Sequence, residues 1–159
     1  MTDIEIRPSR YLAPTVVSLV AEAMADLGAR YGGGGDETPI EAIEFDPPDG
    51  AFMVAWRAGQ AVGCAGWRSH DESEDVAELK RLYVSPDARG LGVATMLLNA
   101  VEDSAADHGR VRMVLECGNK QPEAIALYRK NGYAPIPHFG FYRDAPDVIS
   151  LGRDLERRG

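Results

Sequence analysis

The sequence has few of the residues that build disulfide frameworks and zinc sites. It contains two cysteines, Cys64 and Cys117, and neither belongs to a C-x-x-C pair. Its three histidines, His70, His108 and His138, are so widely spread that neither H-E-x-x-H nor H-x-E with C-x-x-C can be assembled. We therefore expect no metal and no structural disulfide, and we expect small buried thiols in a reducing cytoplasm.

Long apolar runs are also missing. The longest uncharged apolar stretch, residues 11–21, is interrupted by Pro14 and is shorter than the roughly 20 residues of a membrane span. Between Thr2 and Arg10, charged residues alternate with isoleucine where the apolar segment of a secretion signal would have to begin. The sequence therefore predicts a cytoplasmic protein that does not bind a membrane.

Basic charge is scarce as well. The 159 residues include 17 Lys and Arg against 25 Asp and Glu, for a formal net charge of −8. Residues 1–75 carry 14 acidic and 5 basic residues, whereas residues 76–159 carry 11 and 12. An acidic half repels nucleic acid, so we expect no nucleic-acid partner, although the second half could accept a smaller polyanion.

Hydrophobic periodicity predicts alternating strands and helices. A short strand at residues 4–7 precedes an amphipathic helix, whose apolar residues recur from Leu12 to Tyr31 with Pro14 in the first turn. Two β-rich runs, residues 51–56 and 61–67, flank Gly59-Gln60, which predicts a hairpin turning there.

The second half continues the pattern. Strands are expected at residues 76–84 and 111–116, with two more after Tyr133; helices are expected with an apolar stripe from Val93 to Ala105 and at residues 122–130. The order β-α-β-β-β-α-β-α-β-β describes an α/β fold with a mixed sheet and helices on its faces. We expect a single domain over residues 1–159.

A glycine-containing segment joins a predicted strand to the longer of these two helices. Its residues are Arg89, Gly90, Leu91, Gly92, Val93, Ala94 and Thr95. The free N–H groups and the dipole of a helix start favour an anion, and glycines let a phosphate approach the backbone. A dinucleotide loop would need a third glycine where Thr95 stands, and the Gly-Lys-Ser/Thr of a P-loop is absent. A nucleotide-binding protein stays open as an alternative.

The pattern that does fit is R-x-x-G-x-A, formed by Arg89, Gly92 and Ala94. With residues 78–84 before it and residues 124–133 after it, the arrangement resembles the GNAT superfamily of acetyl-CoA-dependent N-acetyltransferases. The resemblance implies a central, mostly antiparallel sheet that splays between its fourth and fifth strands. It also implies acetyl-CoA as cosubstrate, with its pyrophosphate on the backbone amides of residues 89–95. The pantetheine arm is expected to pair with the main chain of Leu82, Tyr83 and Val84.

The resemblance also implies roles for three side chains. Tyr128 matches the phenol that faces the CoA sulfur, and Glu78 matches a carboxylate that is the general base in some branches of the family. Tyr128 could instead simply pack its ring on the sheet, and Glu78 could pair with Lys80 or Arg68 across the sheet. Gln121 stands where the family usually has Asn and is expected to bind the cofactor with the same donor and acceptor on a longer arm.

The implied reaction is direct attack of an amine on the acetyl carbonyl. We expect no acyl-enzyme, because neither cysteine has a histidine placed as its base. Glu116 or a backbone-held water is the alternative general base. The acidic first half would favour encounter with a cationic acceptor, but the acceptor itself stays open among amino acids, polyamines, aminoglycosides and protein amines.

Further expectations concern the surroundings of the site. In the resembled fold the loop at residues 30–37 borders the acceptor cleft, and the aromatic loop of His138, Phe139, Phe141 and Tyr142 is expected to form a wall of the acceptor pocket. Homodimers are common in the resembled family. The alternative function is a non-catalytic acyl-CoA-binding regulatory module.

Overall fold

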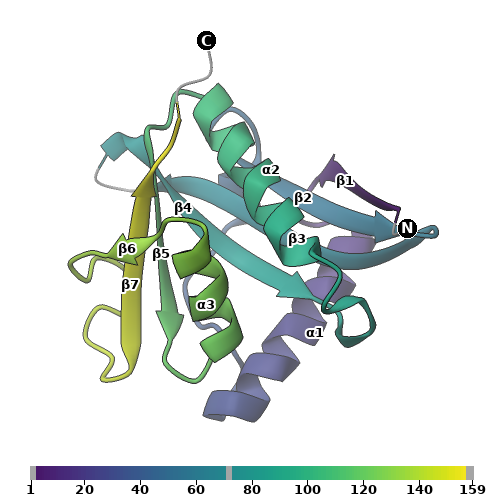
Figure 1. Ribbon diagram of the computed structural model, residues 1–159, viewed down its shortest axis with the longest axis horizontal. Helices are drawn as coiled ribbons and strands as arrows, with labels where there is room; N and C mark the ends of the chain where they lie inside the picture. Colours follow the sequence, from purple (N-terminus) through teal and green to yellow (C-terminus); the bar gives the residue numbers. More distant parts are fainter. Residues whose placement is uncertain (1–2, 71–72, 157–159) are drawn as a thin grey trace.

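The computed structural model describes residues 3–70 and 73–156, and in this part of the chain the strands form one sheet between helices (Figure 1). The strands are β1 Ile4–Ser9, β2 Gly50–Arg57, β3 Gln60–His70, β4 Ser73–Val84, β5 Arg112–Gly118, β6 Ala134–Pro135 and β7 Val148–Asp154. The helices are α1 Pro14–Tyr31, α2 Val93–Asp107 and α3 Pro122–Lys130, with short 3-10 turns η1 Ala42–Phe45 and η2 Pro86–Ala88. The predicted order of strands and helices is confirmed.

The sheet has the order β1-β2-β3-β4-β5-β7-β6. Its neighbouring strands are antiparallel except for β4 and β5, which pair in parallel over Val76–Glu78 and Arg112–Val114. Both strands then continue, to Val84 and to Gly118, without further pairing between them in the described chain. The expected mixed sheet, splayed between its fourth and fifth strands, is therefore confirmed.

Two hydrophobic cores lie on the two faces of this sheet. Helices α2 and α3 lie in front of the sheet in Figure 1, and α1 lies on the other side. On β2, Ala55 joins the core of α2 with Leu97, whereas its neighbour Val54 joins the core of α1 with Val16. Successive strand residues point to opposite faces, so each strand divides its apolar side chains between the two cores.

Two details of the predicted elements are wrong. The hairpin turns at Ala58-Gly59, one residue earlier than expected, and Gln60 already pairs with Arg57. Both turn residues have positive φ, 50° and 78°, as the two-residue turn that matches strand twist requires. Leu12 lies before α1 and is 68% exposed, because the helix begins only at Pro14.

Candidate functional site

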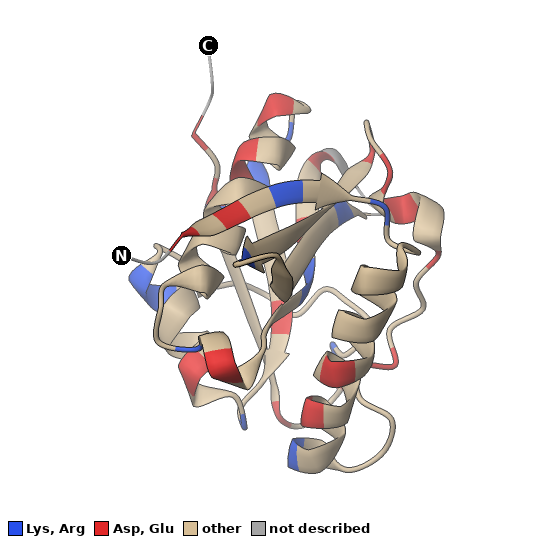
Figure 2. Cartoon of the chain, turned by 90° about the vertical axis from the view of Figure 1, so that its right-hand side faces the viewer, with Lys and Arg blue, Asp and Glu red and all other residues tan. Residues whose placement is uncertain are grey.

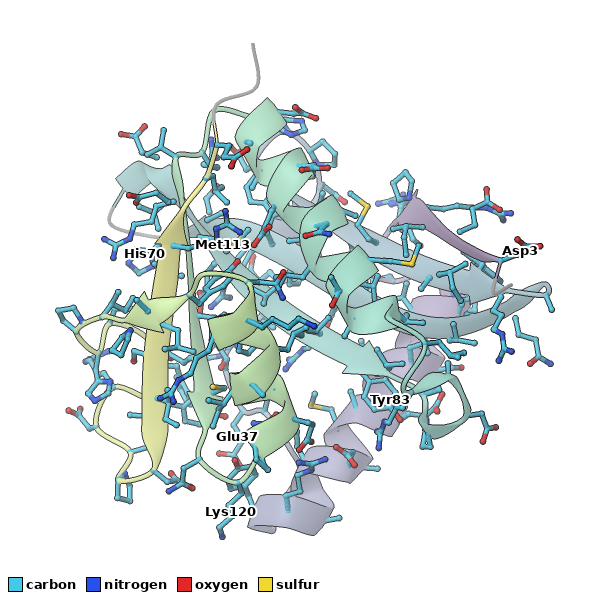
Figure 3. The ribbon with its side chains drawn as sticks, viewed as in Figure 1. Asp3, Glu37, His70, Tyr83, Met113 and Lys120 are labelled. Atoms are coloured by element: carbon cyan, nitrogen blue, oxygen red, sulfur yellow. The ribbon has the colours of Figure 1, made fainter. Side chains whose placement is uncertain are left out.

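A cleft of about 430 Å³ opens where β4 and β5 separate. It is lined by residues 79–83 of β4, residues 115–118 of β5, the C-terminal half of α1 and Tyr128 of α3. Figure 2 shows that the charged residues of α1 lie between the middle of the helix and its C-terminal end. Figure 3 labels Tyr83 and Lys120, which belong to the lining and lie toward α1 in that view. A volume of this size is typical of small-ligand sites.

The cleft has chemically different walls on the two faces of the sheet. Cys117 packs against the core of α2 and α3, to which Tyr128 belongs. Glu116, the residue before Cys117, points to the opposite face, on the side of α1, and so does Lys80 of β4. An apolar wall with a phenol and a thiol therefore faces a polar wall with charged groups.

The backbone of β4 is irregular beside the cleft. Arg81 has φ of 62°, in the left-handed region that side-chain-bearing residues seldom adopt. The register between β3 and β4 shifts at the same place, between Cys64 and Gly66. This is a β-bulge, which bends a strand and re-aims its side chains.

The polar wall centres on Asp36, in the loop after α1. Its carboxylate accepts hydrogen bonds from Lys80 Nζ at 2.8 Å, Arg81 Nη1 at 2.6 Å, Thr38 Oγ1 at 2.6 Å and Tyr142 Oη at 2.9 Å. Burial by itself would raise the pKa of Asp36, but attraction and hydrogen bonding from Lys80, with the bonds from Thr38, outweigh burial and hold the pKa well below its usual range. Asp36 is therefore a carboxylate at neutral pH.

Two glutamates lie near the point where the strands separate. Glu116 lines the cleft, and its carboxylate accepts the backbone N–H groups of Gly140 and Tyr142, each at 3.2 Å. Glu78 is buried, and its Oε1 lies 3.1 Å from Nε of Arg68; it does not belong to the lining. Glu78 thus forms the cross-strand pair with Arg68 that the sequence left open.

The phenol and the thiols are held in their neutral forms. Burial raises the pKa of Tyr128, and the neighbouring Cys117 adds to this shift. Burial likewise raises the pKa of Cys117 to about 11 and that of Cys64 to about 12. Tyr128 is 6% exposed, lines the cleft and contacts Tyr133, with 5.7 Å between ring centroids.

The glycine segment lies just beyond the end of β4. Gly90 and Gly92 have φ of 82° and 81°, and an added Cβ would meet no atom within 4 Å at either position. Gly92 is the N-cap residue of α2 and has no side chain to bond the first-turn N–H groups. Arg89 donates from Nε to the carbonyl of Val84 at 3.0 Å and lies over the ring of Tyr83.

The structure brings part of the predicted set together. Leu82, Tyr83, Gln121 and Tyr128 line the cleft, whereas Val84 and residues 89–95 lie outside its lining. Of the expected aromatic wall, Tyr142 lines the cleft.

The loop at residues 30–37 borders the cleft as expected, through Tyr31, Gly35 and Asp36, but sequence reasoning missed the pairing of Asp36 with Lys80 and Arg81. One signal was available: two consecutive charges interrupt a strand that otherwise alternates, and a regular strand cannot place both on one face. The partner, Asp36, is 44 residues before Lys80 and no local pattern points to it.

Within residues 3–70 and 73–156, no three His, Cys, Asp or Glu side chains are grouped so that they could hold a metal ion. Nor does this part of the chain contain a helix that is long and apolar enough to cross a membrane.

Comparison with known proteins points in one direction. The sequence pattern described as the acetyltransferase (GNAT) family matches residues 18–133. An "IAA acetyltransferase" of Azospirillum brasilense is 36% identical over 151 residues, which are 95% of this chain and 96% of that protein.

Two solved structures share the fold. A proposed acyl-CoA N-acyltransferase of Klebsiella pneumoniae is 26% identical, with a TM-score of 0.79 over 96% of this chain and 98% of its own. A GNAT-family acetyltransferase of Elizabethkingia anophelis, solved with acetyl-CoA bound, is 21% identical with a TM-score of 0.70, and the match covers 96% of this chain and 98% of that one.

Proposed function

Because this chain belongs to the acetyltransferase (GNAT) family, we propose that it is an N-acetyltransferase that moves the acetyl group of acetyl-CoA directly to an amine. The observation that carries the proposal is the separation of β4 from β5, which leaves an edge of β4 unpaired with β5 beside a cleft whose lining reaches Tyr83; Arg89 of the glycine segment lies over the ring of Tyr83. The acetyl-CoA-bound neighbour has the same fold.

The cofactor would be held by two backbone features. At Leu82, Tyr83 and Val84 the described chain shows no pairing of β4 with β5, so main-chain groups on that side can pair with the amides of the pantetheine arm; the carbonyl of Val84 already accepts Nε of Arg89. Residues 89–95 present uncapped N–H groups and the positive end of the α2 dipole to the pyrophosphate. The open space around Gly90 and Gly92 fits a phosphate group, and Gln121 adds an amide at the cleft.

The chemistry requires a base for the amine, polarisation of the carbonyl and an acid for the thiolate. The amine nitrogen attacks the acetyl carbon; the new C–N bond forms, the C–S bond breaks, and the amine proton passes to a carboxylate. Tyr128, neutral at the working pH, donates its phenolic proton to the departing sulfur. Main-chain N–H groups of β4 polarise the carbonyl.

Glu78 and Glu116 are the two candidates for the base. Glu116 has the better support, because it lines the cleft and its two backbone partners leave lone pairs of the carboxylate for a proton. Glu78 is engaged by Arg68, whose Nε donates a hydrogen bond to one of its carboxylate oxygens. An alkyl ammonium group titrates near pH 10, so only a small fraction of the acceptor amine is deprotonated at neutral pH. Whichever glutamate is the base accepts the proton that this amine loses, directly or through an ordered water.

Gly92→Glu tests the cofactor site. The new side chain places bulk and negative charge where the pyrophosphate is expected, so calorimetry should show acetyl-CoA affinity falling at least about 100-fold. Gly109→Glu, at the other end of α2, is the matched control, because Gly109 has φ of 82° and equally open surroundings. Unchanged affinity in folded Gly92→Glu would refute the site. Binding of acetyl-CoA without thiol release for any amine would identify a regulatory module instead.

A further inference from the structure

Lys80 and Arg81 are consecutive residues of β4 that bind the same oxygen atom. In a regular strand, neighbours point to opposite faces. Here Lys80 Nζ lies 2.8 Å and Arg81 Nη1 lies 2.6 Å from Oδ2 of Asp36. The left-handed φ of Arg81 and the accompanying register shift turn both cations toward the face of α1.

Within this group of three side chains, two cations face one carboxylate; elsewhere the cleft lining includes the acidic residues Asp26, Glu116 and Asp147 and the basic residue Lys120. The side chains of Lys80, Arg81 and Asp36 are 8%, 7% and 14% exposed, so water reaches them little. One carboxylate balances one of two cations, whereas buried charges in proteins are normally paired. All three residues line the cleft, so an anion that enters it can supply the missing charge.

A carboxylate on the other strand gives the cleft a second sign of charge. Glu116 of β5 lines the same cleft, and its carboxylate accepts hydrogen bonds from two backbone N–H groups. Among the described residues, no ion pair of Glu116 with a Lys or Arg side chain is seen. Asp26 also lines the cleft, but Arg30 lies 3.3 Å from it. A cation pair on one strand and a carboxylate on the next match a molecule that carries an anion and an amine together.

Resting on the acetyl transfer proposed above, we propose that the acceptor is an amine that also carries a carboxylate, in the manner of an amino acid. Lys80 and Arg81 bind the carboxylate of the acceptor, and its amine faces Glu116. Arg81 already donates from Nη1 to Asp36 and from Nε to Oη of Tyr11 at 3.4 Å. Its Nη2 and the second hydrogen of Nη1 are the donors that would hold the acceptor carboxylate and orient it before attack. The net acidic charge of the first half of the chain affects encounter alone, and these buried groups decide which acceptor binds.

The test compares each of a panel of amino acids with its own amide in a thiol-release assay with acetyl-CoA. The amine of the amide is the less basic of the two, so chemistry alone favours the amide. We expect the preferred amino acid to exceed its amide by at least about tenfold in kcat/KM, the usual effect of a charge-assisted hydrogen bond. Comparable or better use of the amides and of simple alkylamines would overturn the inference and leave the acetyl transfer standing.

Arg81→Gln assigns the preference to the cation pair. It should raise KM for the amino acid and bring the ratio of kcat/KM for the amino acid to kcat/KM for its amide toward one, while KM for acetyl-CoA stays unchanged. Arg81→Lys, which keeps the charge and loses the fork, should give an intermediate ratio. Arg110→Gln is the matched control, because Arg110 is similarly buried at 11% and lies outside the cleft. If Arg81→Gln weakens acetyl-CoA and keeps the ratio, the cations serve the cofactor and the inference is wrong.

A binding measurement separates this inference from the proposed function. Propionate at millimolar concentration should raise the melting temperature of the unmodified protein, propionamide should not, and Arg81→Gln should abolish the difference. This result together with no thiol release from any amine would support the carboxylate site and reject the acetyl transfer. Equal effects of propionate and propionamide would reject the carboxylate site whatever the turnover.

Discussion

Asp36→Asn should destabilise the protein strongly, because it leaves Lys80 and Arg81 facing each other without a negative charge. The three side chains are nearly buried, and breaking a buried ion pair by removing one partner costs about 3–5 kcal/mol. For a chain of this length, each kcal/mol lowers the melting temperature by about 2–4 °C, so the expected decrease is roughly 6–20 °C. The isosteric amide can keep the hydrogen bonds that Thr38 and Tyr142 donate to Oδ1, whereas its NH2 group replaces Oδ2 and cannot accept from Lys80 and Arg81. The loss therefore reports on the charge and on these two charge-assisted hydrogen bonds.

Urea unfolding at neutral pH measures this loss, and Glu5→Gln is the control. Glu5 pairs with Arg7 at the surface, and its replacement should leave the unfolding midpoint unchanged. The double variant Asp36→Asn/Arg81→Gln should recover part of the loss, because one of the two repelling cations is gone. A decrease in the free energy of unfolding of less than about 1 kcal/mol would show that solvent screens the three side chains, and the unbalanced cation among Lys80, Arg81 and Asp36 would no longer support an anion site.

The pH dependence of stability has a definite sign. The pKa of Asp36 in the folded protein lies below its value of 3.8 in the unfolded chain. Its stabilising contribution is therefore complete above the unfolded pKa and is lost as the pH falls through the folded pKa. The unmodified protein should therefore have a higher free energy of unfolding than Asp36→Asn at neutral pH, and this difference in free energy should become smaller as the pH falls below about 4.

Three further predictions concern catalysis. Tyr128→Phe should lower kcat by roughly 100-fold and preserve the affinity for acetyl-CoA. Tyr133→Phe, which removes the buried hydrogen bond from Tyr133 to Glu102, should lower stability and keep turnover. If Tyr128→Phe instead lowers stability and keeps turnover, Tyr128 is a packing residue. Glu116→Gln should remove the acidic limb of the pH profile of kcat/KM and Glu78→Gln should keep it; loss of the limb in Glu78→Gln alone would return the base to Glu78. Cys117→Ala should keep kcat within about twofold, and mass spectrometry after incubation with acetyl-CoA should detect no acetylated protein; an added acetyl group on Cys117 would refute direct attack.

Much of the fold could be predicted because its signals are local. Period-2 and period-3.6 patterns located the strands and helices, and Pro14 marked the start of α1. The errors were local too: residues 58–60 offered two possible turns, and the sequence alone does not show that Ala58 adopts a left-handed φ of 50°. A glycine next to it made the later position look equally suitable.

Part of the candidate site has a local signal in the sequence and part of it has none. The loop of residues 89–95 and Tyr128 have a motif that can be read directly from the chain. The Asp36 group has none, because it depends on a bulge at Arg81 and on a loop contact 45 residues away. The environment of Glu78 was also undecided, since Arg68 becomes its neighbour only when β3 and β4 pair in this register. Contacts made by register and bulges are non-local and leave no periodic signal.

The bulge at Arg81 has two structural effects. On one side it bends β4, whose free edge beyond Glu78 faces the cleft, and on the other it turns a second cation onto Asp36. A left-handed conformation costs a residue with a side chain about 1–3 kcal/mol, and glycine would adopt it without this strain. If only the bend mattered, glycine would be the favourable choice at position 81. An arginine there is consistent with a need for the guanidinium itself, which the ion pair with Asp36 stabilises and which the acceptor carboxylate would complete.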